Sequence, residues 1–339
     1  MEIIATIWKN PLDFKKIQEM LGAGATMLRI KWAHVSTEEV LSVLKELRQY
    51  LDEQKSDAKI LLDMPEVKVR LGEIKSIKEN VVAGKMYTVR CEQSTETIDE
   101  FIPFSFSPFT RFFSVNDSVL IGDGELRFTV KEIISDTEMN IEFLNNGELC
   151  QHRGLFSSRL ADMFDHTESI IAALPYLKEI QPDAIALSFV NGASYIEKVK
   201  VAIQKHFGDS WQPIILAKIE SQQGLDHAEE IMQAADYTVV ARGDLALTTD
   251  YTRLILEQKK LCELGKKTGK PVIVATQILD SCLTNSIPTR PDIADVTNIA
   301  LDGAAGMWFS KATAHNEHPG ETIRIAKEIF HAALSHHHI

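Results

Sequence analysis

The sequence has few cysteines, and none of them lies close to another. The four cysteines in its 339 residues are Cys91, Cys150, Cys262 and Cys282. No CxxC pair is present, so the spacing suggests neither a zinc site nor a disulfide framework. Sparse, scattered cysteines are typical of a reducing compartment, and we expect a cytoplasmic protein.

Long apolar runs are also missing. No segment approaches the roughly 18 uninterrupted apolar residues that indicate a membrane-spanning helix. The first residues, MEIIATIWKNPLDFKK, lack the basic start, apolar stretch and small-residue cleavage site of a signal peptide. We therefore expect no membrane partner.

Positive charge is scarce. The chain has 36 Lys and Arg against 48 Asp and Glu, which gives a formal net charge of −12 at pH 7. An acidic chain of this kind argues against non-specific binding to nucleic acid. If the substrates are anions, a small number of well-placed cations must receive them.

Hydrophobic residues make up 45% of the chain, which is enough for a full core without disulfide staples. Short apolar or β-branched segments alternate with amphipathic ones, of which 36–54, 192–206 and 251–269 have helical spacing. Segment 36–54 opens with Ser36 and has Glu39 three residues later, as in a capping box. The expected strands are 3–7, 26–30, 59–63, 184–188, 214–218, 237–241, 272–275 and 305–309.

Apolar strands followed by helices indicate a parallel sheet covered by helices. Eight such units make an α/β fold of the (β/α)8 TIM-barrel type the leading prediction, with a doubly wound open sheet as the alternative. Residues 72–153 break the rhythm, because they read as short alternating strands with turn signals such as GDG at 122–124. We expect a discontinuous barrel over 1–71 and 154–339, with 72–153 as an inserted small all-β lid domain.

Polar residues follow the predicted strands, at the ends where TIM-barrel active sites lie. Glu220 and Asp244 are carboxylates on neighbouring strand ends, an arrangement that suits Mg²⁺ or Mn²⁺. The alternative is that they form ion pairs with nearby Lys or Arg. The strand-end residues are Arg29, Asp63, Arg70, Ser188, Lys218, Glu220, Arg242, Gly243, Asp244, Thr276, Gln277 and Ser310.

The cations among these residues are candidates for binding an anion. A guanidinium fork matches phosphate or carboxylate, so Arg29 and Arg70 are candidate clamps, or else form salt bridges at the rim. Lys218 belongs to the same face, or else is a charge partner of Glu220. Gly243 begins a strand-to-helix turn whose backbone N–H groups suit an anionic group. The residues predict metal-assisted chemistry on a small phosphate- or carboxylate-bearing substrate.

Seven segments carry a resemblance to a known family. IILAKIESQQGL from 214, VVARGDLAL from 239, GKPVIVATQILDS from 269 and PTRPDIADVTNIALDGA from 288 are the most specific. AGATMLRIKWAH from 23, LLDMPEVKVRLG from 61 and VLIGDGELRF from 119 are weaker matches. In this order and spacing they resemble the segments of pyruvate kinases along nearly the whole chain, without the stretch that matches the family's C-terminal regulatory domain.

The resemblance implies roles at the reacting centre. Lys218 would stabilise the phosphoryl group in flight. Glu220 and Asp244 would hold the divalent cation. Thr276 would lie beside the enolate carbon that gains a proton. Among substrate contacts we also include Ser188 and Gly243.

The resemblance implies further contacts around this centre. Arg29 would contact the transferring phosphate. Arg70 and His34 would lie on the nucleotide side. Ser310 would belong to the segment of the eighth strand near the proton-donor network.

The chain departs from the family at the potassium site, which uses Asn, Ser, Asp and Thr. The matching residues are Lys31, Ala33, Asp63 and Met64, so only Asp63 keeps an oxygen ligand. Lys68 stands where most members have Glu, and members with Lys there are similar to those that need no monovalent cation. We expect the ammonium of Lys31 or Lys68 to supply the missing charge, and K⁺ not to be required.

Other departures concern the nucleotide side. Residues 7–10 differ from the family's first strand end, Ser169 replaces a Lys, and SKATA at 310–314 replaces SGETA. The leading hypothesis is a phosphotransferase that converts phosphoenolpyruvate and ADP to pyruvate and ATP. The alternatives are an enzyme using the same metal–enolate site on another small keto or carboxylic acid, and a non-catalytic binding paralogue. The sequence leaves a homodimer through the barrel open.

Overall fold

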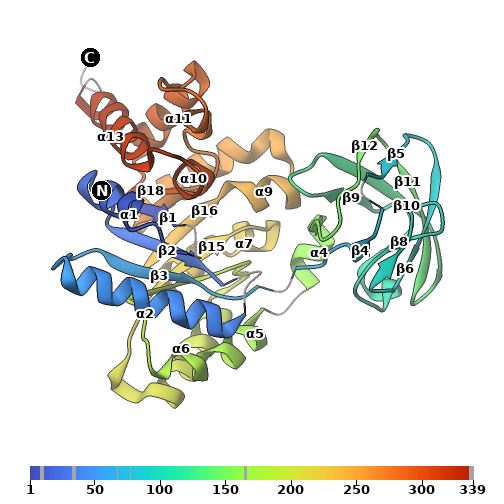
Figure 1. Ribbon diagram of the computed structural model, residues 1–339, viewed down its shortest axis with the longest axis horizontal. Helices are drawn as coiled ribbons and strands as arrows, with labels where there is room; N and C mark the ends of the chain where they lie inside the picture. The colour runs from blue at the N-terminus through green and yellow to red at the C-terminus, as the bar shows by residue number, and fades with distance from the viewer. Residues whose placement is uncertain (8–10, 33–35, 67, 77, 164–165, 336–339) are drawn as a thin grey trace. The chain divides into compact units, whose positions relative to one another are not determined.

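The computed structural model describes residues 1–7, 11–32, 36–66, 68–76, 78–163 and 166–335. The chain forms two compact units (Figure 1). The barrel unit comprises Met1–Glu66, His166–Leu245 and Thr252–Ile339, and the inserted β unit comprises Val67–Asp165 and Ala246–Tyr251. Each unit has its own hydrophobic core.

Eight parallel strands of the barrel unit close into a barrel in the order β1-β18-β17-β16-β15-β14-β3-β2. This confirms the predicted TIM barrel, and the open doubly wound sheet is wrong because β1 pairs with both β2 and β18. The strands are β1 (Glu2–Thr6), β2 (Met27–Lys31), β3 (Lys59–Asp63), β14 (Ala184–Leu187), β15 (Ile214–Ile219), β16 (Tyr237–Ala241), β17 (Val272–Ala275) and β18 (Gly306–Phe309).

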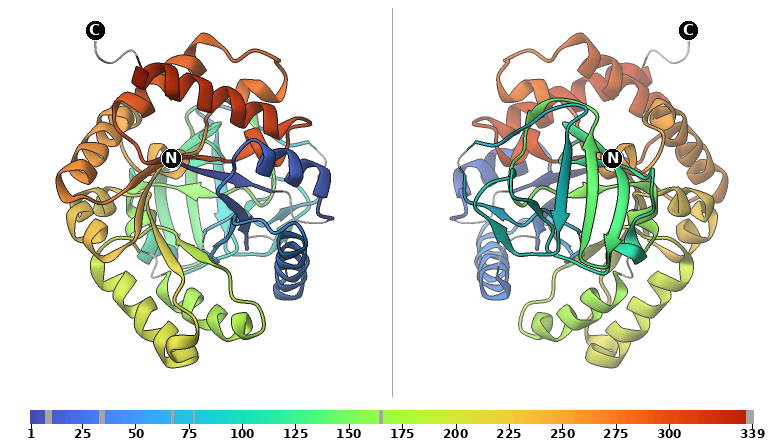
Figure 2. Two further views of the ribbon diagram at one scale, coloured as in Figure 1. Left: turned by 90° about the vertical axis from the view of Figure 1, so that its left-hand side faces the viewer. Right: turned by 90° about the vertical axis from the view of Figure 1, so that its right-hand side faces the viewer.

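Helices surround these strands, as the left view of Figure 2 shows. They are α1 (Phe14–Gly22), α2 (Thr37–Glu53), α5 (Thr167–Ala173), α6 (Ala193–Phe207), α7 (Gln222–Asp226), α8 (Ala228–Ala234), α9 (Arg242–Thr248), α10 (Leu254–Thr268), α11 (Arg290–Leu301), α12 (Lys311–Ala314) and α13 (Pro319–Ser335). Short 3₁₀ helices are η1 (Leu174–Lys178), η2 (Gly208–Ser210), η3 (Tyr251–Arg253) and η4 (Asp280–Leu283).

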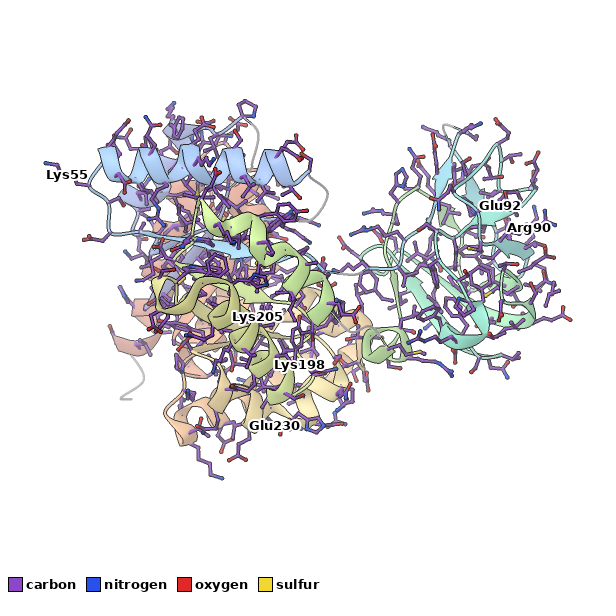
Figure 3. All side chains as sticks on the ribbon, turned by 90° about the horizontal axis from the view of Figure 1, so that it is seen from below. Lys55, Arg90, Glu92, Lys198, Lys205 and Glu230 are labelled. Atoms are coloured by element: carbon purple, nitrogen blue, oxygen red, sulfur yellow. The ribbon has the colours of Figure 1, made fainter. Side chains whose placement is uncertain are left out.

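Amphipathic spacing explains how these helices pack. On α6, Ile196, Val199 and Ile203 are buried, whereas Lys198 and Lys205 are exposed (Figure 3). The buried side chains cover the outward-facing residues of the strands, in a core that continues around the barrel. Among the described residues, no helix is both long and apolar enough to cross a membrane.

A second, smaller core fills the inside of the barrel. Its members are Ile4, Met27, Leu61, Ala184, Ala186, Leu216, Val239, Ile273, Ala275 and Trp308. Because side chains alternate along a strand, residues two positions from these also face inward. This alternation decides which side chains meet at the carboxyl ends of the strands.

The inserted unit is mainly β-structure, as predicted. A six-stranded sheet has the order β13-β9-β10-β11-β6-β8, and the pairs β12-β5 and β4-β7 form small sheets. Phenylalanines such as Phe104, Phe109 and Phe128 fill its core. The elements are β4 (Glu73–Ile74), β5 (Asn80–Val81), β6 (Met86–Arg90), β7 (Ser94–Thr95), β8 (Ile102–Pro103), α3 (Phe109–Phe112), β9 (Ser118–Ile121), β10 (Leu126–Ser135), β11 (Glu138–Phe143), β12 (Gly147–Glu148), β13 (Leu155–Phe156) and α4 (Ser158–Met163).

The capping box of α2 gives a first prediction. Ser36 Oγ accepts from the Glu39 N–H at 3.2 Å, and Glu39 Oε2 accepts from the Ser36 N–H at 3.0 Å. We expect Ser36→Ala to destabilise the first turn of α2 by about 1 kcal/mol, measured by hydrogen exchange of its amides. Ser36→Thr should retain most of the protection, and Ser194→Ala on exposed α6 is the control. Equal protection in Ser36→Ala and wild type would contradict this account.

Candidate active site

The inward-facing side chains change from apolar to polar at the carboxyl ends of the barrel strands. On six of the barrel strands we single out a polar residue two positions beyond an inner-core residue. These residues are Thr6 on β1, Arg29 on β2, Asp63 on β3, Ser188 after β14, Lys218 on β15 and Ser310 after β18. The alternation therefore directs one polar group from each of these six strands toward the same end of the barrel interior.

Asp63 lies at the centre of these contacts and is only 1% exposed. Its Oδ1 lies 3.0 Å from Lys218 Nζ, and its Oδ2 accepts hydrogen bonds from Arg29 Nε at 3.2 Å and from Arg29 Nη2. Burial opposes ionisation of this carboxyl group. The positive charges of Lys218, Arg29 and Lys31 outweigh burial, so the pKa of Asp63 lies below its ordinary value.

Lys218 is also buried, with 8% of its side chain exposed. Besides Asp63, its Nζ lies 3.5 Å from Glu220 Oε1. Burial alone would lower the pKa of Lys218, but the carboxylates of Asp63, Glu220 and Glu66 raise it above its ordinary value. Lys218 is therefore a fixed positive charge and not a general base.

Residues of three other strands, β1, β3 and β18, contact the Arg29 guanidinium. Its Nη1 donates to Thr6 Oγ1 at 3.3 Å, and its guanidinium carbon lies 5.4 Å from the centroid of the Trp308 ring. Thr6 in turn donates to the Phe309 carbonyl at 2.7 Å. Together with the two bonds to Asp63, these contacts fix the plane of the guanidinium, which is what recognition of a phosphate or carboxylate requires.

Glu220 and Asp244 are the candidate metal ligands. Glu220 is 1% exposed, and its Oε2 accepts from the Phe189 N–H at 2.8 Å. The pairing of Ile219 with Val240 places the end of β15 beside the end of β16, and Asp244 follows in the first turn of α9. Lys218 Nζ lies 3.5 Å from Glu220 Oε1, which is the ion pair that the sequence raised as the alternative for this carboxylate.

The donor chemistry here fits Mg²⁺ or Mn²⁺. These ions take oxygen ligands, and Mg²⁺ is commonly held by one or two carboxylates with water and substrate completing its shell. The described residues contain no cluster of three or more His, Cys, Asp or Glu side chains that would form an all-protein cage. Two carboxylates at adjacent strand ends suit an ion that is shared with a substrate.

Thr276 lies in a strained segment after β17. Its φ is +71°, and Gln277 and Leu279 also have positive φ, at +52° and +55°. A positive φ is unusual for a β-branched residue and marks a backbone that its surroundings hold in place. Thr276 Oγ1 accepts from the Gly243 N–H at 2.7 Å and donates to the Ala275 carbonyl at 2.6 Å.

Arg242 holds this segment. Its Nη2 donates to the Thr276 carbonyl at 2.9 Å and to the Gln277 carbonyl at 3.1 Å. Asp295 on α11 binds the same guanidinium through both carboxylate oxygens, at 2.5 and 2.8 Å. The sequence places Arg242 at a strand end but does not indicate this role, because Thr276 and Asp295 lie 34 and 53 positions away.

Ser188 presents a buried hydroxyl at the end of β14. Its Oγ has no hydrogen-bond partner among the described residues, whereas its carbonyl accepts from Tyr195 Oη at 3.1 Å. A buried hydroxyl without a partner is costly, and a bound ligand or water at the strand ends would satisfy it. This supports the inclusion of Ser188 among the substrate contacts.

The predicted site residues thus separate into groups. Ion pairs join Arg29, Asp63, Lys218 and Glu220 within the barrel unit. Lys31 lies opposite Asp63 in the strand pairing, and its Nζ lies 3.2 Å from Glu66 Oε1. Gly243 and Thr276 form a second group. Ser310 precedes α12 and accepts from the Thr313 N–H at 3.4 Å.

Two predicted residues belong to the inserted unit. Arg70 donates from Nη1 to the His152 carbonyl at 3.1 Å. Lys68 Nζ lies 5.2 Å from the centroid of the Phe156 ring. His34, predicted on the nucleotide side, lies outside the described residues, as do Ala33 and residues 8–10.

Comparison with known proteins decides the family. The profile described as pyruvate kinase, barrel domain, matches residues 1–323. The chain belongs to the pyruvate kinase family. Membership in this family supports a phosphotransferase enzyme.

Individual pyruvate kinases agree with this result. That of Thermococcus litoralis is 30% identical over 331 residues, which are 97% of this chain and 68% of the relative. The pyruvate kinase of Chlamydia trachomatis serovar L2 is 31% identical over 336 residues, which are 97% of this chain and 67% of the relative. The crystal structure of a pyruvate kinase from Cryptosporidium parvum matches with a TM-score of 0.84 at 25% identity, over 99% of this chain and 69% of the other. The crystal structure of the Pyrobaculum aerophilum pyruvate kinase matches with a TM-score of 0.82 at 26% identity, over 98% of this chain and 73% of the other.

The buried charges give a second prediction. Asp63→Asn leaves Arg29 and Lys218 without their shared carboxylate, and we expect a loss of about 3–5 kcal/mol in the free energy of unfolding, measured with urea at pH 7. Because the pKa of Asp63 is lowered by folding, its contribution is present above its unfolded pKa of about 3.9 and is lost as the pH falls through the folded value.

The acid limb of the stability profile provides the check. Wild type should lose this contribution below pH 4, whereas Asp63→Asn should show a flatter profile there. Glu179→Gln, which removes the carboxylate of an exposed pair with Lys45, is the control and should leave stability unchanged. An Asp63→Asn variant as stable as wild type would show that these contacts contribute nothing net.

Proposed function

We propose that the chain transfers the phosphoryl group of phosphoenolpyruvate to ADP and forms pyruvate and ATP. One observation carries the proposal: the barrel interior ends in a buried cluster in which Asp63 holds Arg29 and Lys218, and Glu220 lies against Lys218. Membership in the pyruvate kinase family supports the same reaction class. Phosphoryl transfer depends mainly on positioning and on stabilising charge, and this cluster supplies both.

In this proposal the fixed cations act on the phosphoryl group. The P–O bond to the enolate breaks while an oxygen of the terminal phosphate of ADP forms the new P–O bond. Lys218 and Arg29 face the negative charge that spreads over the transferring group, and their positions are set before substrate binds. Fixed charges in a buried site need little reorganisation during the reaction, which is the main source of catalysis of this kind.

Thr276 and Ser188 act on the pyruvate side. The enolate carbon gains a proton after phosphoryl transfer, and the strained Thr276 segment would place its hydroxyl beside that carbon. The buried hydroxyl of Ser188 has no hydrogen-bond partner among the described residues, so it could donate to or accept from the substrate. Arg70 and His34 remain our proposal for the nucleotide side.

Glu220 and Asp244 would hold Mg²⁺ or Mn²⁺. When bound, such an ion offsets the charge of the phosphate and carboxylate and orients them. The hydrogen bond from the Phe189 N–H keeps Glu220 oriented, so the carboxylate does not depend on the ion for its position.

We also propose that the enzyme needs no K⁺. Of the residues that match the family's potassium site, Lys31 carries a charge of its own and Met64 and Ala33 offer no oxygen side chain. Asp63 keeps its oxygens, but Lys218 and Arg29 already bind both of them. This donor set does not fit a potassium ion.

A second candidate is an enzyme that uses the same site on another small keto or carboxylic acid. It is favoured by departures at the rim, since Lys311 is exposed where the family has a neutral residue and Ser169 replaces a lysine. Ser169 donates to the His166 carbonyl at 2.8 Å within its own helix turn and carries no charge toward a nucleotide. A non-catalytic paralogue is disfavoured because Lys218, Glu220 and Asp244 are all present.

A coupled assay tests the proposal. With phosphoenolpyruvate, ADP and Mg²⁺ in potassium-free buffer, we expect pyruvate formation, and we expect Lys218→Met to reduce kcat roughly 10²–10³-fold because it removes a preorganised charge. Lys198→Met, on the exposed face of α6, is the matched control and should match wild type (Figure 3).

The alternatives give different results in the same experiment. Absence of turnover together with Mg²⁺-dependent binding of pyruvate or oxalate would favour the second candidate. Absence of both turnover and metal or keto-acid binding would leave the binding paralogue. A requirement for K⁺ in an otherwise active wild type would refute the potassium claim alone.

A further inference from the structure

Glu66 is a buried carboxylate that forms an ion pair with Lys31, and none of the sequence patterns singled it out. Its side chain is only 3% exposed, and its Oε1 lies 3.2 Å from Lys31 Nζ. Lys31 ends β2, two positions beyond Arg29, so it faces the barrel interior. The strand pairing sets Lys31 directly opposite Asp63.

The burial of Glu66 needs a reason. A carboxylate that loses its water is destabilising unless a cation is held against it. Arg29 and Lys218 form ion pairs with Asp63 and Glu220, and Lys31 forms one with Glu66. These ion pairs contain three cations and three carboxylates. Without Glu66 these groups would carry a net positive charge, and Lys31 would lose one of its ion-pair partners.

Both members of the Lys31–Glu66 pair act on the centre of the site. Lys31 helps to hold the pKa of Asp63 below its ordinary value, and Glu66 opposes it. Glu66 also contributes to the raised pKa of Lys218, after Asp63 and Glu220. The pair is therefore close enough to change the charge that a bound phosphate experiences.

We infer that Glu66 is a positioning residue that holds the Lys31 ammonium beside Asp63 as a built-in monovalent cation. This inference rests on the proposed function and identifies which lysine supplies the charge. The pairing of β2 with β3 sets Lys31 opposite Asp63 inside one compact unit. Lys68 is the other lysine considered, and its variant is compared with that of Lys31 below. A lysine ammonium is a compact point charge, as a monovalent ion is.

Four variants test the inference in potassium-free buffer: Lys31→Met, Lys68→Met, Glu66→Gln and the double variant Lys31→Met/Glu66→Gln. The first readout is kcat/KM for phosphoenolpyruvate. The second is the rise in Tm caused by phosphoenolpyruvate or by inorganic phosphate, which requires no turnover. Tm without ligand checks folding, and Lys198→Met is again the control.

We expect Lys31→Met to lower kcat/KM roughly tenfold or more and to reduce the anion-induced rise in Tm. Added K⁺ should restore part of both in this variant, because the carboxylates of Asp63 and Glu66 are left without the ammonium. The double variant should bind phosphoenolpyruvate better than Lys31→Met, since it also removes the negative charge that the Lys31 ammonium offset. Glu66→Gln should raise KM more than it lowers kcat, and Glu66→Asp should recover part of that loss.

Several outcomes would overturn the inference. One is a K⁺ dependence that appears in Lys68→Met and not in Lys31→Met. Another is independent, additive losses in the double variant, because Glu66 would then act without Lys31. The inference would also be overturned if phosphoenolpyruvate or phosphate raised the Tm of Glu66→Gln as much as that of wild type. This comparison remains possible if Lys31→Met does not fold.

The two proposals fail in distinguishable ways. Wild type that binds phosphoenolpyruvate but gives no pyruvate with ADP refutes the proposed reaction and leaves the Lys31 result intact. Wild type whose Tm responds to neither anion refutes the inference, because Lys31 then belongs to no anion site.

Discussion

The site depends on one buried carboxylate. Asp63 neutralises Arg29 and Lys218 at once, so two cations remain inside a protein whose net charge is −12. Without it, the two positive charges would repel each other in a medium that screens poorly, and neither would keep its geometry. The two cations that we propose for binding the phosphate are thus held by a carboxylate that is itself only 1% exposed.

Much of the barrel and of the cluster around Asp63 could be predicted from the sequence, because both follow from the regular spacing of apolar residues in helices and strands. Apolar strands separated by amphipathic helices specify a barrel, and alternation along each strand specifies which side chain faces inward. Leu61 lies in the inner core, so Asp63 must face the same way, and the same reasoning applies from Leu216 to Lys218. Parallel strands then bring these side chains to one end without any further information.

The contacts made by the loops after the strands could not be predicted, because they follow no regular spacing in the sequence. Glu66 lies in an irregular segment after β3, where the sequence does not indicate whether a carboxylate is buried or exposed. The Gly243 N–H, expected to be available for an anion, donates to Thr276 Oγ1, and this contact joins residues 33 positions apart. Such contacts depend on loop conformations that are set by tertiary packing, which local spacing does not encode.

The guanidinium of Arg242 has a consequence for how the enzyme tolerates change. It binds two carbonyls of the Thr276 segment with one nitrogen and the carboxylate of Asp295 with two. The loop after β17 is thereby tied to α11, a helix of the outer layer. A mutation or ligand that shifts α11 would therefore also shift the Thr276 segment, so a change in the outer layer of the barrel can alter this loop without any substitution in the loop itself.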